Sequence, residues 1–212
     1  MGGARQAYSS IRDAATKPVL VMMGINAFTG VAITGLANFT TAYIVQVTTL
    51  GVSSASLLYS VFPLGGLVST IFWGAATDRF DRWKIMFLGT LASIVLLVAL
   101  VASTLPAVLL PVLLARGLIS NASGIALFAV FAALSEQRTM ATSFALLDLL
   151  GNIGMAASPL LAGVVADMFG LTTVFAVIPV LVGGVALVLY LPVRGYMRQS
   201  AVAKSLAAVD AQ

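Results

Sequence analysis

The chain contains neither cysteine nor histidine. The first absence excludes a disulfide, a thiolate nucleophile and a cysteine metal site. The second removes the commonest metal ligand and the commonest general base near neutral pH. Because most enzyme chemistries depend on one of these two side chains, we expect no catalytic residue, no bound metal and no cofactor.

Charge is also scarce. Only 8% of the 212 residues are charged, whereas soluble domains carry about 25%. Hydrophobic residues make up 60% of the chain. The chain has too few polar residues to cover the surface of a soluble domain of this size. The composition therefore predicts an integral membrane protein with the lipid bilayer as its main partner.

Six apolar segments are long enough to cross a bilayer as helices, which takes roughly 20 residues each. We place them at 18–47, 53–77, 84–103, 106–134, 139–166 and 172–193. The predicted fold class is thus an all-α integral membrane protein. Its parts are an N-terminal segment at 1–17, a six-helix transmembrane domain at 18–193 and a tail at 194–212.

The positive charges are distributed unevenly between the connections. Ten of the eleven Lys and Arg residues lie in alternate ones: residues 1–17, 78–84 and 135–138 and the tail. The connections at 48–52, 103–106 and 167–171 carry none. By the positive-inside rule the basic connections and both termini are cytoplasmic, and we expect a bacterial inner membrane. The positions of the basic residues are then explained by the orientation of the spans in the membrane, and we expect no nucleic-acid partner.

The chain contains an internal repeat. The pattern Ser-x4-Gly-x3-Asp-x-Phe occurs at 69–80 and again at 158–169, and Gly65 and Gly154 precede the two copies at the same offset. The first copy ends the second span and the second copy ends the fifth span, on the opposite side. Three spans repeated in opposite orientation form the 3+3 inverted repeat of many transporter folds. The alternative is a chance match among residue types that are frequent here.

The segment GAATDRFDRWK at 74–84 holds the densest run of charge in the chain. It resembles the Gly-x-x-x-Asp-Arg-x-Gly-Arg-Arg/Lys signature of the major facilitator superfamily, which joins the second and third helices of each six-helix half. The matching residues are Gly74, Asp78, Arg79, Arg82 and Lys84. Two positions depart from the signature, because Asp81 replaces a Gly and Trp83 replaces a basic residue. The resemblance extends over residues 18–193.

Such departures are more typical of the C-terminal half of a full transporter than of the N-terminal half. FPLGG followed by GAATDRF is similar to organic-acid and aromatic-acid proton symporters. The resemblance thus implies half of a secondary active transporter. It would move a small solute, such as an organic anion, by alternating access with proton coupling.

The family fold has two six-helix halves, so the resemblance implies a second half as partner. That half is the rest of a longer chain, a second copy of this chain, or a separate chain. The alternative from another class is a non-transporting membrane module that packs within a larger complex.

Arg116 is the only basic residue deep in a span. A central Arg costs about 2.5–3.5 kcal/mol on insertion scales, so it usually faces a cavity or a partner. The family's first and fourth helices line the central cavity. The resemblance therefore implies that Arg116 binds an anionic substrate group, or a carboxylate when empty. The other expected substrate-binding residues are Asn26, Thr34, Asn38, Ser120 and Asn121. The alternative for these hydroxyls and amides is helix packing.

Two further roles follow from the resemblance. The signature Asp faces the fifth-helix N-terminus of the opposite half, where a carboxylate is worth roughly 0.3–1 kcal/mol. The gating residues implied are Gly74, Asp78, Arg79 and Arg82; the alternative is a solvated loop of membrane anchors. Asp148 in the fifth span is a candidate for proton coupling, or it pairs with Arg138 or Arg116.

Overall fold

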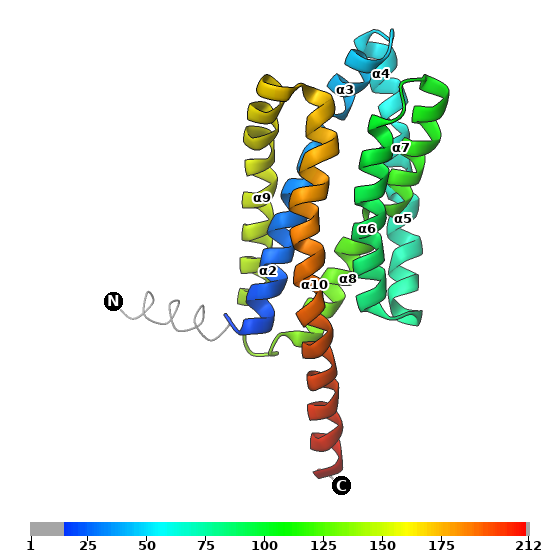
Figure 1. The fold of residues 1–212 in the computed structure, drawn as a ribbon. Helices are drawn as coiled ribbons and strands as arrows, with labels where there is room; N and C mark the ends of the chain where they lie inside the picture. The colour runs from blue at the N-terminus through cyan, green and yellow to red at the C-terminus, as the bar shows by residue number, and fades with distance from the viewer. Residues whose placement is uncertain (1–14, 211–212) are drawn as a thin grey trace.

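The structure is a computed structural model that describes the backbone of residues 15–210 and the side chains of residues 15–199. This part of the chain is a bundle of long helices without strands (Figure 1). Most of the predicted N-terminal segment 1–17 lies outside the described residues.

The elements, in chain order, are α2 (Lys17–Thr29), η1 (Gly30–Thr34), η2 (Gly35–Phe39), α3 (Thr40–Val47), α4 (Val52–Tyr59), α5 (Val61–Arg79), α6 (Arg82–Val101), α7 (Pro106–Ser120), α8 (Ala122–Leu134), α9 (Met140–Phe169) and α10 (Leu171–Asp210). Five of the six spans are single helices or two helices joined almost directly. The first span differs, because a π-helix and a 3-10 helix interrupt its middle.

Six stretches are long and apolar enough to cross a membrane, which confirms the predicted number of spans. They are Lys17–Val47, Val52–Arg79, Arg82–Val101, Pro106–Leu134, Met140–Phe169 and Leu171–Gln199. Their limits differ from the predicted ones by at most three residues, except at the end of the sixth. There the backbone of α10 remains helical to Asp210, through the segment expected to be a separate tail. The Ala-rich sequence AVAKSLAAV at 201–209 favours this continuation, since Ala has the highest helix propensity.

The connections alternate between the two ends of the bundle. Figure 1 shows the α5–α6 and α8–α9 connections at the end where α2 begins and where α10 projects beyond the other helices. The α3–α4, α6–α7 and α9–α10 connections lie at the opposite end. We call the first end the basic end, because Arg79, Arg82 and Arg138 lie in its connections. Alternate connections thus share an end, as the charge pattern predicted.

Local sequence explains where several helices begin and end. Pro18 and Pro106 lie in the first turns of α2 and α7, where a missing N–H breaks no helical hydrogen bond. The carboxylate of Asp81 accepts the backbone N–H of Trp83 at 3.0 Å and thereby caps α6. Gly170 separates α9 from α10 with a φ of 83°, a conformation that other residues rarely adopt.

The packed interior consists of two hydrophobic clusters, one containing Met22, Met86 and Phe131, the other containing Tyr43, Leu97 and Phe175. Each cluster draws on the first, third and sixth spans. These three spans are therefore joined to the rest of the bundle over most of their length.

The basic end of α6 is joined to α10 by aromatic and polar contacts. The indole N–H of Trp83 donates to the carbonyl of Tyr190 at 2.9 Å, and the guanidinium of Arg194 lies 5.2 Å from a ring centroid of Trp83. The hydroxyls of Thr90 and Tyr190 are 2.8 Å apart in the buried interior. These contacts give Trp83, which departs from the family signature, a packing role that a basic residue would not fill.

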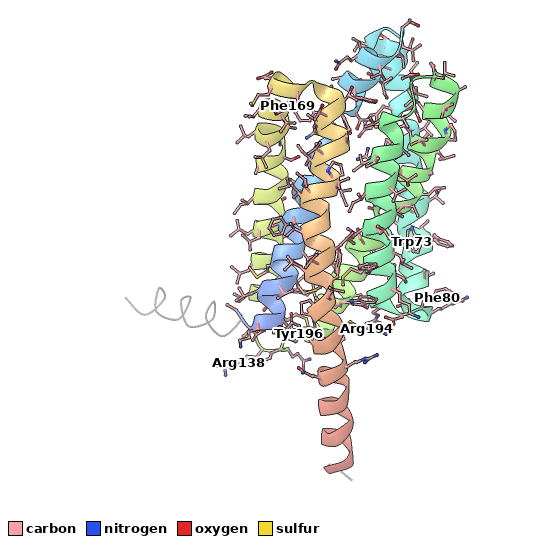
Figure 2. The ribbon with its side chains drawn as sticks, viewed as in Figure 1. Trp73, Phe80, Arg138, Phe169, Arg194 and Tyr196 are labelled. Carbon is pink, nitrogen blue, oxygen red and sulfur yellow. The ribbon has the colours of Figure 1, made fainter. Side chains whose placement is uncertain are left out.

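Residues matched by the repeat have similar surroundings. Ser69 and Ser158 are both almost fully buried, with 1% and 0% of their surfaces exposed. Phe80 and Phe169 are both largely exposed, and they lie at opposite ends of the bundle (Figure 2). This arrangement fits the predicted 3+3 inverted repeat.

Two glycines of α9 provide a matched test of helix packing. A Cβ at Gly154 would collide with the backbone carbonyl of Ala27 in α2, whereas a Cβ at Gly163 would meet no atom within 4 Å. We expect Gly154→Ala to destabilise the protein by about 1–3 kcal/mol, because backbone does not yield as a side chain does. We expect Gly163→Ala to be neutral or stabilising by up to about 1 kcal/mol through helix propensity. Thermal unfolding of the detergent-purified variants measures both, and equal shifts would contradict the α2–α9 packing.

Candidate functional site

The first span loses its regular α-helical form between Gly30 and Phe39. Residues Gly30–Thr34 form a π-helix and Gly35–Phe39 form a 3-10 helix. Helix α9 packs closely against this irregular segment: a Cβ at Gly30 would lie 2.9 Å from the Gly151 carbonyl oxygen. The hydroxyl of Ser158 in α9 also donates to the Val31 carbonyl at 2.9 Å. Segments of this kind often mark functional sites.

The guanidinium of Arg116 in α7 contacts the π-helix and the residue that follows the 3-10 helix. Its Nη2 donates to the carbonyl of Ile33 at 3.2 Å, and its Nη1 donates to Oγ1 of Thr40 at 3.4 Å. The guanidinium carbon lies 4.6 Å from the ring centroid of Phe62. Only 2% of the residue is exposed. The charge is therefore held by one carbonyl, one hydroxyl and one aromatic face, and none of these contacts is a carboxylate.

One part of this guanidinium has no partner. Nε of Arg116 is buried and makes no hydrogen bond to any described residue. A buried donor of a charged group without an acceptor is costly, typically more than about 1–3 kcal/mol. In native proteins such a group is usually explained by an ordered water, an ion or a functional role.

Two adjoining cavities surround this part of the bundle. The Arg116 cavity, about 370 Å³, is lined by Ile33, Thr34, Ala37, Phe62, Pro63, Gly66, Leu67, Thr70, Ser93, Arg116, Ser120 and Asn121. The Asp148 cavity, about 220 Å³, is lined by Asn26, Thr29, Gly30, Ile33, Thr34, Ser120, Asn121, Ser123, Gly124, Leu127, Phe128, Asp148, Gly151, Asn152, Met155 and Tyr190. Ile33, Thr34, Ser120 and Asn121 line both and form their common wall.

The helix break between α7 and α8 supplies one side of that wall. The side-chain amide of Asn121 donates to the Gly66 carbonyl and to Thr70 Oγ1, both at 2.9 Å. The hydroxyl of Ser120 donates to the Gly117 carbonyl at 2.7 Å within its own helix. The Asn121 amide therefore joins the fourth span to the second, while the Ser120 hydroxyl is satisfied within its own helix, and both residues also line the cavities.

The structure brings together five of the six expected substrate-binding residues. Asn26 and Thr34 line the cavities with Arg116, Ser120 and Asn121. The amide of Asn26 also donates to the Leu147 carbonyl at 2.9 Å and so joins α2 to α9.

Asn38 is the exception, because it lines neither cavity. Its assignment assumed a regular α-helix through the first span. The π and 3-10 segments change the number of residues per turn, and this shifts the register beyond Thr34. Thr40, which the sequence reasoning did not select, contacts Arg116 instead.

Asp148 lines the cavity named after it and is exposed there. Neither Arg138 nor Arg116, the two partners considered from the sequence, forms an ion pair with it among the described contacts. Asn152 lines the same cavity one turn further along α9. The sequence reasoning missed Asn152, although its i, i+4 spacing from Asp148 places the two side chains on one helix face.

The expected gating residues lie at the basic end of α5. Asp78 and Arg79 are exposed and make no hydrogen bond to a described side chain or backbone group. Nε of Arg82 donates to the Thr77 carbonyl at 3.2 Å and so satisfies the end of α5. A Cβ at Gly74 would meet no atom within 4 Å, so this glycine makes no close approach to another helix inside the described chain.

The described chain is thus a bundle of six helices able to span a membrane, with cavities between them that both polar and apolar side chains line. The sequence model of the Major Facilitator Superfamily matches residues 22–206, and the chain belongs to this family. The family consists of membrane transporters, so the predicted family and the six-helix half of its fold are confirmed. No curated protein matches the chain.

Proposed function

We propose that the chain is one half of a secondary active transporter that binds a small organic anion at Arg116. The observation that carries the proposal is the buried guanidinium, which lines the Arg116 cavity and contacts no carboxylate among the described residues. An Arg fork matches the two oxygens of a carboxylate, and the bonds it forms are about twice as strong as neutral ones. A cavity of about 370 Å³ suits a small solute, since ligand pockets measure about 300–1,000 Å³.

The irregular segment of the first span connects binding to a conformational change. A carboxylate that reaches the guanidinium competes with the Ile33 carbonyl and the Thr40 hydroxyl for the same donors. Release of these two groups removes the contacts that join Arg116 to the π-helix and to the first residue of α3. The anion thus binds the two forms of the span with different affinity, which is what alternating access requires.

Asp148 is the proposed site of proton coupling. Its cavity shares a wall with the Arg116 cavity, so a proton on this carboxylate and an anion on Arg116 would be bound on either side of Thr34 and Asn121. An ionisable residue in a membrane span is costly and usually functional. No contact to a described residue explains Asp148 otherwise.

A second six-helix half completes the transporter in this proposal. The second and fifth spans are the least buried of the six: only 17% and 22% of the residues in their most apolar stretches are buried inside the bundle. Helix α9 begins after Thr139, whose side chain makes no capping hydrogen bond, so the N-terminus of α9 remains available for a carboxylate. Asp78, at the same basic end, is the carboxylate that would occupy the corresponding N-terminus of the opposite half. The basic end faces the cytoplasm of a bacterial cell in this proposal.

Anion binding is tested with benzoate and succinate as probes. We expect one of them to raise the thermal unfolding temperature of the purified chain, since ligand at a hundredfold excess over Kd adds about 2.7 kcal/mol. We expect Arg116→Gln to weaken this binding at least tenfold, because the charged hydrogen bonds are lost. Arg138→Gln, which removes an exposed arginine in a connection, serves as the control. Equal stabilisation of both variants would assign the anion to another site.

Proton coupling is tested by uptake of the stabilising anion into proteoliposomes with an acidic exterior. We expect Asp148→Asn to abolish the part of the uptake that depends on the pH gradient, because an amide does not carry a proton. Downhill exchange of the anion should continue in this variant. Uptake that still follows the pH gradient would remove Asp148 from the coupling mechanism.

The second half is tested by cross-linking in the cysteine-free chain. We expect Asp78→Cys in one copy to form a disulfide with Thr139→Cys in a co-expressed copy, since a carboxylate bound at that N-terminus brings the two positions close. Phe169→Cys, at the opposite end, replaces Thr139→Cys as the control. If the inserted copies form no disulfide, a second copy does not occupy this face and the opposite half is a different sequence.

A further inference from the structure

Most hydrogen-bond donors that line the Arg116 cavity are already engaged within the protein. The hydroxyl of Ser93 donates to the Gly89 carbonyl at 2.8 Å, and the hydroxyl of Ser120 donates to the Gly117 carbonyl at 2.7 Å. A hydroxyl has a single proton to donate. While these bonds persist, neither side chain has a donor left for a ligand.

The donors on the second and fourth spans are engaged with one another. Thr70 Oγ1 donates to the Gly66 carbonyl at 3.1 Å. The side-chain amide of Asn121 donates to the same carbonyl and to Thr70 Oγ1, both at 2.9 Å, and so uses both of its N–H protons. Asn121 therefore keeps only its carbonyl oxygen for a ligand, and an acceptor of this kind does not bind a carboxylate.

Arg116 is the exception among these side chains. Its guanidinium has more N–H donors than the two that reach Ile33 and Thr40. Thr34 carries the one other lining donor that makes no hydrogen bond to a described residue. The rest of the lining is apolar apart from the backbone at Gly66, and its side chains are Ile33, Ala37, Phe62, Pro63 and Leu67.

The charges of the two cavities distinguish a first carboxylate from a second one. Arg116 is the only charged residue among the described residues that line its cavity. Beyond the common wall, the charged lining residue is Asp148. A second substrate carboxylate that extended past the wall would meet a like charge whenever Asp148 is ionised. The described residues of both cavities thus provide a counter-charge for one carboxylate.

We propose that the Arg116 cavity accepts a monocarboxylate with an apolar body and excludes a dicarboxylate of the same length. This inference rests on the proposed function and narrows the class of anion that the proposed function leaves open. The guanidinium binds the single carboxylate, and the apolar wall contacts the rest of the molecule. A second carboxylate would lose its hydration without gaining a donor or a counter-charge, which lowers its affinity. Specificity therefore comes from donors that the protein has already used.

The test compares pentanoate with glutarate, which has the same number of carbon atoms but ends in a second carboxylate. At neutral pH both carboxyl groups of glutarate are ionised. Affinity for the purified chain is measured from the dependence of its thermal unfolding temperature on ligand concentration. We expect pentanoate to bind at least about tenfold more tightly, since a charged group left without its hydrogen-bond partner costs at least that factor.

A lysine added to the common wall provides the converse test. Thr34 is exposed and lines both cavities, so Thr34→Lys supplies a second cation there. We expect this variant to raise the affinity for glutarate relative to pentanoate at least about tenfold. Asn38→Lys is the matched control, because Asn38 is an exposed residue of the same span that lines neither cavity. It should keep the wild-type order of affinities.

The outcomes separate this inference from the proposed function. Glutarate that binds the wild-type chain as tightly as pentanoate, with both weakened by Arg116→Gln, would overturn the inference and leave anion binding at Arg116 intact. If both probes bind Arg116→Gln as tightly as the wild type, the inference and the proposed binding at Arg116 fail together. No binding of pentanoate would overturn the inference alone, because benzoate tests the proposed function separately.

Discussion

The burial of one guanidinium is the constraint on which the centre of this bundle depends. A positive charge among apolar helices requires acceptors, and most carbonyls of a regular α-helix are already bonded within that helix. The first span supplies two acceptors at its irregular segment: the carbonyl of Ile33 in the π-helix and the hydroxyl of Thr40, which follows the 3-10 helix. The close packing of α9 at Gly30 and the bond from Ser158 to Val31 hold the span in this form. Charge burial, helix irregularity and helix packing are thus parts of one arrangement.

Sequence reasoning gave the spans and their alternation because both follow from composition. Apolar length sets where a helix crosses the membrane, and the uneven placement of Lys and Arg separates the two ends. Arg116 stood out for the same reason, as the one basic residue inside an apolar segment. Its surroundings did not follow, because periodicity assumes a constant number of residues per turn. Asn38 was therefore selected and Thr40 was missed.

The departures from the family signature show a second limit of sequence reasoning. Compared with the signature, Asp81 and Trp83 replace a glycine and a basic residue that the family usually has. In the structure Asp81 caps α6, and Trp83 joins that helix to α10 through the Tyr190 carbonyl and Arg194. Sequence periodicity predicts neither contact, because the Trp83 contacts depend on residues remote in the chain and the Asp81 cap depends on the geometry of a turn. Helix α10 continues past the predicted end of the sixth span for a related reason, because hydropathy marks where a span leaves the membrane and not where its helix stops.

The common wall of the two cavities has a consequence for stoichiometry. Ile33, Thr34, Ser120 and Asn121 bound both spaces, so a displacement of these residues that enlarges one space reduces the other. The volumes of the two cavities are therefore inversely related. A large solute on one side therefore excludes an equally large one on the other, whereas a proton takes no volume and is compatible with either position of the wall. In the proposed transporter, such a geometry would favour the movement of one solute at a time.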